Sequence, residues 1–245
     1  MLLLPRRRGT ADRATGAGVL LELRFFEIYR NSEYLLLLLQ GAGMSAALAI
    51  CGGIVGFALA AILASVRYAE IPVLKTVSAV YVDFIRNTPL IVQLFFVAFG
   101  LPRLLGYSWP FWAHGLLALV LNFSAYFAEI LRAGFNAVPK GQIEAADTLG
   151  LKRPATFRMI IFPQAASAMY PSLNSQFIFL FLTTGVLAEI GVVDLTQAGR
   201  FIDSRTFRSF EVFISLTLIY MAMALSFKYA LTLLQRRLFR WQAAR

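Results

Sequence analysis

Five stretches of the chain are apolar over lengths close to, or above, the roughly 20 residues that a helix needs to cross a bilayer. They cover residues 34–66, 71–101, 110–133, 156–182 and 210–234. The short alternating segments of a membrane β-barrel are absent from the sequence. The pattern therefore predicts an all-α polytopic membrane protein with about five transmembrane helices.

The second stretch is interrupted near its middle. Its first half is amphipathic, its second half is apolar, and residues 86–89 (RNTP) separate them. A proline pushes the residue before it out of helical geometry, so we expect a kink or a short break there. In the first stretch, Gly52 and Gly56 have the spacing at which helices pack closely in lipid. We expect that pair to pack against another helix of the same subunit.

Composition supports the membrane assignment and sets the orientation. Hydrophobic residues make up 59% of the chain and charged residues 15%, whereas a soluble domain carries roughly a quarter charged residues. The net charge of +10 comes from basic residues at the ends of apolar stretches, which favours a role in orientation over nucleic-acid binding. Counting Lys and Arg on alternate sides places the loop that contains Glu144, and the C-terminus, in the cytoplasm. The single cysteine, Cys51, excludes an intrachain disulfide.

The first 33 residues form a tail that does not fit this orientation. Its arginines would lie outside, which the positive-inside rule disfavours. A mis-assigned start codon is one explanation, and a surface-lying helix around residues 20–29 is another. Both remain open. We assign residues 34–240 to a single transmembrane domain and residues 241–245 to a C-terminal tail.

A short helix is predicted in the cytoplasmic loop, within residues 139–152. Residues 142–149 suit a helix, and Gly150 follows at the position where helices commonly end with a residue in the left-handed conformation. Ile143, Ala146 and Leu149 would share one face, with Ala145 beside them. Such a helix is too short to be stable alone, so it needs a surface to dock on. That surface is either the membrane or a partner protein.

The same loop resembles a known motif. Glu144-Ala145-Ala146, then Gly150, Ile160 and Pro163, resembles the EAA loop of inner-membrane permease subunits of ABC importers, with Phe162 in place of the usual leucine. Four further stretches are similar to the branch of that family that carries polar amino acids (histidine, glutamate, glutamine, arginine and opines). They are FIRNTPLIVQLFFVAFGLP (84–102), SAYFAEILRAG (124–134), PKGQIEAADTLGL (139–151) and FPQA (162–165). The resemblance covers roughly residues 30–240.

The resemblance implies a type I ABC importer permease of MetI-like architecture, multi-pass in a bacterial inner membrane. The loop helix would then be a coupling helix, seated on an ATP-binding subunit. Two such ATPase subunits, a second permease chain (identical or paralogous), a periplasmic solute-binding protein and membrane lipid are the implied partners. The residues that would contact the ATPase are Gln142, Glu144, Ala145, Ala146, Asp147 and Gly150.

This chain is not expected to be an enzyme. It has no GxxxxGK[ST] phosphate loop, no nucleophile–base constellation and no metal-ligand spacing. ATP and Mg²⁺ would be bound by the partner ATPase, and we expect no cofactor on this chain. One departure from the family pattern lies at residues 182–186, where LTTGV replaces a segment often written KDTSL. That departure suggests an atypical substrate preference or partner subunit.

Polar residues within the spans are candidates for a solute path because they are costly in lipid. Asn122 and Tyr126 are four apart and share a helical face. Hydrogen bonding between helices is the alternative role. Gln93, Thr183 and Thr184 are further candidates. The pairs Glu129/Arg132 and Asp83/Arg86 are three apart and are expected to pair across one helical turn.

The leading hypothesis is a permease subunit for polar or charged amino acids or opine-like derivatives. An ion-gradient-driven secondary transporter is the main alternative, but that class commonly has ionisable residues near the midplane and repeated halves. A membrane scaffold that transports nothing is the third.

Overall fold

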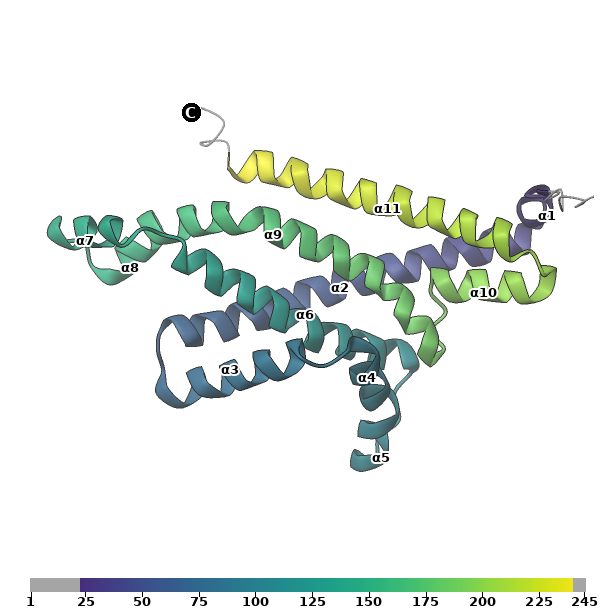
Figure 1. The fold of residues 1–245 in the computed structure, drawn as a ribbon, viewed down its shortest axis with the longest axis horizontal. Helices are drawn as coiled ribbons and strands as arrows, with labels where there is room; N and C mark the ends of the chain where they lie inside the picture. Colours follow the sequence, from purple (N-terminus) through teal and green to yellow (C-terminus); the bar gives the residue numbers. More distant parts are fainter. Residues whose placement is uncertain (1–22, 240–245) are drawn as a thin grey trace, which may run out of the picture.

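The computed structural model describes residues 23–239, and every described element is helical (Figure 1). Four helical stretches are long and apolar enough to cross a membrane, and a bent pair of helices makes a fifth candidate. The four are Ser32–Tyr68, Phe111–Asn136, Arg153–Ile190 and Ser209–Leu238. The predicted all-α polytopic fold is therefore confirmed.

The bounds of the elements follow the predicted stretches closely, with one exception described below. The N-terminal half comprises α1 (Phe26–Tyr29), α2 (Ser32–Tyr68), α3 (Pro72–Arg86), α4 (Leu90–Phe95), the π-helix η1 (Phe96–Gly100), α5 (Leu101–Leu105) and α6 (Phe111–Asn136). The remainder comprises α7 (Lys140–Thr148), α8 (Arg153–Thr156), the π-helix η2 (Phe157–Ile161), α9 (Phe162–Thr183), the 3₁₀ helix η3 (Thr184–Ile190), α10 (Leu195–Thr206) and α11 (Ser209–Leu238).

The second apolar stretch is broken where the sequence predicted. Helix α3 ends at Arg86, α4 begins after Pro89, and the two halves meet at 106°. Pro89 has an extended backbone, so it cannot continue α3. Figure 1 shows α4 and α5 pointing away from the long axis of the bundle.

Helices α2 and α6 form the centre of the bundle. A Cβ atom on Gly56 would lie 3.5 Å from the Val120 carbonyl oxygen, and one on Gly52 would lie 3.5 Å from the Leu119 Cβ atom. The small residues of α2 therefore let the two helices approach closely, as predicted for packing within one subunit. The largest fully buried side chains of this core are Phe123, Phe127, Leu94, Leu119, Leu180 and Leu187.

Helix α10 is the exception, since it lies between two of the predicted apolar stretches and outside all five. Asp194 caps it by accepting a 2.8 Å hydrogen bond from the backbone N–H of Gln197. Leu195 and Ile202 are buried on its inner face. A Cβ atom on Gly41 of α2 would lie 2.7 Å from the Asp194 carbonyl oxygen, so α2 and the start of α10 are in close contact.

The described part of the N-terminal tail is docked rather than free. Ile28 of α1 is 1% exposed and belongs to a second apolar cluster with residues of α2, α10 and α11. Arg208 holds Glu27 through a 2.6 Å Nε–Oε2 hydrogen bond, and Tyr29 donates to the Ser215 hydroxyl at 2.8 Å. Residues 20–22 of the predicted surface-lying helix fall outside the described residues. In Figure 1, α1 lies at one end of the molecule, while α7 and the C-terminal end of α11 lie at the other.

Candidate functional site

The loop helix predicted from the sequence is present as α7. It follows Pro139 and ends in a Schellman motif: the N–H of Leu151 donates to the Ala146 carbonyl, and that of Gly150 to the Asp147 carbonyl, both at 3.0 Å. Gly150 has a φ of +73°, which a glycine adopts without strain. The predicted helix and its left-handed cap are confirmed.

The predicted docking face of α7 is only partly correct. Ala146 is 1% exposed and Ile143 packs against the core of the spans, whereas Leu149 is 78% exposed. The helix is too short to stand alone, and its own spans supply the surface that it needs. The exposed residues of α7 and its cap include Gln142, Glu144, Ala145, Asp147, Thr148, Leu149 and Gly150.

An amide pair fixes α7 to the start of the next span. The Gln164 Nε2 atom donates to the Gln142 Oε1 atom at 2.6 Å and to the Ile160 carbonyl at 3.0 Å. Gln164 belongs to the FPQA stretch, whose sequence alone did not indicate this contact. The pair therefore joins α7 to α9.

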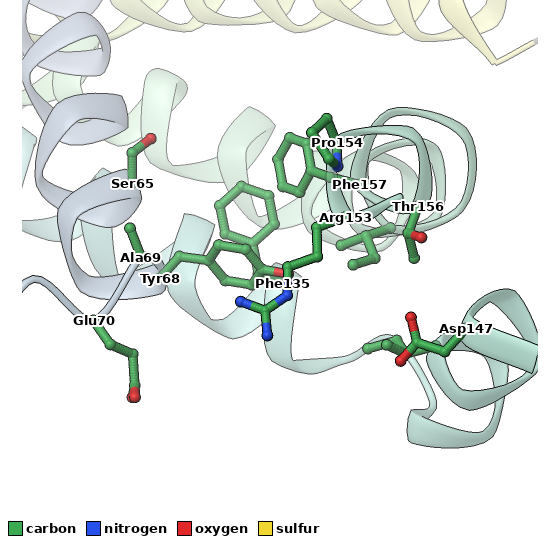
Figure 2. Close-up of a pocket in the computed structure, with 12 residues that line it drawn as sticks. Ser65, Tyr68, Ala69, Glu70, Phe135, Asp147, Arg153, Pro154, Thr156 and Phe157 are labelled. Carbon is green, nitrogen blue, oxygen red and sulfur yellow. The ribbon is translucent and has the colours of Figure 1, made fainter. Parts of the chain in front are cut away.

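A cavity of about 830 Å³ lies behind α7, beside the C-terminal end of α2 (Figure 2). The rings of Tyr68, Phe135 and Phe157 form one wall, with centroids 5.4–5.8 Å apart. In Figure 2 the Arg153 side chain reaches between Glu70 and Asp147. Packing behind α7 is therefore incomplete, which leaves the helix room to shift.

Two of the candidate path residues contact each other. The Asn122 Nδ2 atom donates to the Gln93 Oε1 atom at 2.9 Å, and Gln93 Nε2 donates to the Ile85 carbonyl at 2.8 Å and to the Thr88 hydroxyl at 2.6 Å. Asn122 is 4% exposed. In this structure the two side chains connect α6 to the break between α3 and α4, which is the helix-to-helix role left open by the sequence.

The other candidate path residues lie apart from that pair. The Tyr126 ring is half-buried, and the Arg86 guanidinium carbon lies 5.7 Å from its centroid. Thr183 donates to the Phe179 carbonyl at 2.7 Å, and Thr184, which is buried, donates to the Phe181 carbonyl at 2.8 Å. Both hydroxyls are thus satisfied by their own helix.

An ion cluster joins α2, α3 and α6. Arg132 Nε donates to Glu129 at 3.1 Å, which confirms the predicted pair within α6. Glu129 also pairs with Arg67 of α2 at 3.4 Å and with Arg86 of α3 at 3.9 Å. Among the described residues no ion pair joins Asp83 to Arg86, so that prediction is wrong. Arg86 is instead drawn to Glu129, a contact between helices that spacing along one helix does not reveal.

A buried carboxyl that was not predicted from the sequence lies at the start of α10. Asp194 lies between η3 and α10 with no exposed surface, and Tyr220 donates to its Oδ2 atom at 3.4 Å. Burial raises the pKa of Asp194 from 3.8 to about 6. The only sequence signal was a lone acidic residue after an apolar run.

Comparisons with known proteins agree with this architecture. Residues 52–240 match the family model described as the inner membrane component of binding-protein-dependent transport systems. A probable glutamine ABC transporter permease of Bacillus subtilis is 35% identical over 211 residues, covering 85% of this chain and 94% of that protein. An octopine transport system permease of Rhizobium meliloti is 36% identical over 200 residues, or 78% of this chain and 81% of that protein.

Solved structures of ABC transporters share this fold. An amino acid ABC transporter, crystallised with histidines, superposes with a TM-score of 0.80 at 35% identity, covering 88% of this chain and 99% of that chain. The inward-facing MetNI methionine transporter superposes with a TM-score of 0.71 at 17% identity, covering 85% of this chain and 99% of that chain. The predicted MetI-like architecture is therefore confirmed. With its spans, its loop helix and a family match over most of its length, the chain belongs to the inner-membrane permease components of binding-protein-dependent ABC transporters.

Proposed function

We propose that this chain forms the translocation path of an ATP-driven importer of polar amino acids or opine-like derivatives. The names of its relatives support the solute class, since they include a glutamine permease and an octopine permease. The observation that carries the coupling role is α7, a short helix with a left-handed C-terminal cap, whose exposed side is mostly polar and includes one small side chain, Ala145.

In this proposal α7 seats on a separate ATP-binding subunit. ATP and Mg²⁺ belong to that subunit, and a second permease chain and a periplasmic binding protein complete the importer. Closure of the two ATPase subunits would push α7, and the Gln142–Gln164 pair would pass the displacement to α9. The C-terminus is cytoplasmic by the positive-inside rule, because α7 and the basic end of α11 lie at the same end of the molecule.

The test is ATP-dependent uptake by the reconstituted complex with an Ala145→Glu variant. Ala145 is exposed, so a glutamate there leaves the fold intact but prevents close approach of the ATPase. We expect uptake to be lost, while an Ala145→Ser variant, which keeps a small side chain, transports like the parent. Ala146→Glu is not a suitable variant, because Ala146 is buried and the fold itself would be disturbed.

Three results would contradict the proposal. If Ala145→Glu transports as well as the parent, α7 is not the coupling element. Uptake driven by an ion gradient without the ATPase would indicate a secondary transporter. If the ATPase binds this chain, but solute does not stimulate ATP hydrolysis and no uptake is measured, the chain is a scaffold.

A further inference from the structure

The cavity behind α7 has the size of a small-molecule site. Its volume of about 830 Å³ lies within the range of roughly 300–1,000 Å³ that is usual for ligand pockets. Its walls come from the C-terminal ends of α2 and α6, from α7, and from α8 and η2 at the start of the next span. These elements meet at the end of the molecule that the positive-inside rule assigns to the cytoplasm.

One wall of the cavity is aromatic. The rings of Tyr68 and Phe135 have centroids 5.4 Å apart, and the Phe157 centroid lies 5.7 Å from that of Tyr68 and 5.8 Å from that of Phe135. Although the three rings pack together, 45% of the Tyr68 surface stays exposed. Such a wall can hold the apolar part of a solute by contact, or a cationic side chain by cation–π attraction.

Two opposite charges line the same cavity without pairing. Asp147 belongs to α7 and Arg153 to α8, and among the described residues neither side chain makes an ion pair or a hydrogen bond. A third charge on the cavity, Glu70, is already held by Lys75 at 2.8 Å. Figure 2 shows the Arg153 guanidinium in the open space of the cavity, with Glu70 on one side and Asp147 on the other.

These charges discriminate between classes of ligand. A nucleotide or another polyanion would bring further negative charge close to Asp147. A lipid tail would leave both the guanidinium and the carboxylate uncompensated. A zwitterionic amino acid matches both groups: its carboxylate accepts hydrogen bonds from Arg153, which suits bidentate recognition, and its ammonium group is attracted to Asp147.

We infer that this cavity is a cytoplasmic binding site for a zwitterionic amino acid, held between Arg153 and Asp147 with its side chain against the aromatic wall. The inference rests on the proposed importer function and adds regulation to it, since the imported solute would bind here once it has accumulated. Asp147 is on α7 and Arg153 is at the start of the next span, so a bound amino acid bridges the two. It stabilises the position of α7 in which both charges are engaged, and it thereby slows transport.

The experiment uses the full complex in liposomes, with ATP enclosed and with the binding protein and labelled L-glutamine outside. Unlabelled L-glutamine is enclosed at increasing concentrations, and the initial rate of uptake is measured. We expect enclosed glutamine to slow uptake by the parent. The Arg153→Gln variant should need at least about tenfold more for the same slowing, because it loses a hydrogen bond between charged groups. Arg153 is exposed, so this substitution leaves the fold intact.

Arg158→Gln is the matched control. Arg158 is an exposed arginine of η2 that makes no ion pair among the described residues and does not line the cavity. Uptake by this variant should be slowed like that of the parent. Enclosed L-glutaminamide, with an amide in place of the carboxylate, is the ligand control. It should slow the parent no more than it slows Arg153→Gln, because it offers Arg153 no charged acceptor.

Uptake without enclosed glutamine tests the importer function separately. If the parent imports glutamine with ATP, but enclosed glutamine has no effect or slows Arg153→Gln equally, the inference is wrong and the importer function stands. If the parent imports nothing, the proposed function fails, and binding decides the inference. Labelled glutamine is then bound to the detergent-solubilised complex without the binding protein, and Arg153→Gln should lose a site that the parent has. Equal binding by the two proteins, or none by the parent, would overturn it.

Discussion

At the scale of single residues, Asp194 combines a capping role with full burial. Its Oδ1 atom caps α10, and Tyr220, which also bonds Thr196 at 2.9 Å, faces its Oδ2 atom. Ser45 of α2 accepts the N–H of the next residue, Leu195. The groups around this carboxyl are neutral, and without a cation nearby burial dominates and favours the protonated form.

This arrangement makes the stability of the subunit depend on pH. The pKa of Asp194 is raised from 3.8 to about 6 in the folded state. The protonated carboxyl therefore contributes its full stabilisation below about pH 3.8, and this contribution is lost as the pH rises through about 6. The effect is at most about 3 kcal/mol. We expect the thermal midpoint of the purified complex to fall by a few degrees between about pH 5 and about pH 7.5. Asp194→Asn keeps the oxygen cap, and its midpoint should lack this part of the pH dependence. An identical pH profile in both proteins would contradict the prediction.

The residues of α7 show where sequence patterns mislead. Both alanines of the EAA stretch were expected to contact the ATPase, but Ala145 is exposed and Ala146 is buried against the spans. Adjacent helical positions point about 100° apart, so one alanine can face the spans while its neighbour faces outward. Which of the two faces outward depends on how α7 sits on the spans, and the sequence of α7 does not contain that information.

At the scale of elements, the break between α3 and α4 depends on more than its proline. The chain direction changes by 106°, and the carbonyl groups of Ile85 and Thr88 lack the usual helical bond from the N–H four residues later; Gln93 Nε2 donates to both, at 2.8 and 3.2 Å. Asn122 then fixes the Gln93 amide from α6. The proline made the break predictable, whereas the amide network that holds its angle is formed between segments far apart in the sequence.

A double-mutant cycle tests this network. Gln93→Ala leaves buried polar groups unpaired and should lower the free energy of unfolding by about 1–3 kcal/mol. Asn122→Ala should cost a similar amount, and the double variant should lose less than the sum by about 0.5–1.5 kcal/mol. Thr183→Ala is the control, because that hydroxyl bonds only to its own helix. Additive effects in denaturant unfolding would show that the two amides do not act together.

At the scale of the whole molecule, Glu129 joins three helices. Its carboxylate is 24% exposed and pairs with guanidinium groups from α2, α3 and α6. One carboxylate among three cations is an unbalanced cluster, so removing it leaves like charges close together. Sequence spacing predicted only the Arg132 contact, which lies within one helix.

We expect Glu129→Gln to destabilise the subunit by about 1–2 kcal/mol, less than for a fully buried pair because water partly screens the cluster. The loss should shrink as salt is added, since ions screen the remaining repulsion. The matched control is Glu70→Gln, which breaks an exposed pair with Lys75 and should change little. Unfolding midpoints of both variants at low and high salt are the measurement. Equal effects of the two changes would mean that the cluster does not hold the helices together.

The sequence by itself determined the spans, the break before Pro89, the capped loop helix and the family. Each of these depends on local hydrophobicity, on backbone restrictions at proline and glycine, or on short motifs. Only the tertiary structure decided which side of α7 is open, that Gln93 and Asn122 meet, that Arg86 turns to Glu129, and that α10 and α1 pack at the outer end. These features depend on contacts between helices that are far apart in the sequence. No single stretch of sequence shows which residues burial brings together, and the energy of each contact depends on those neighbours.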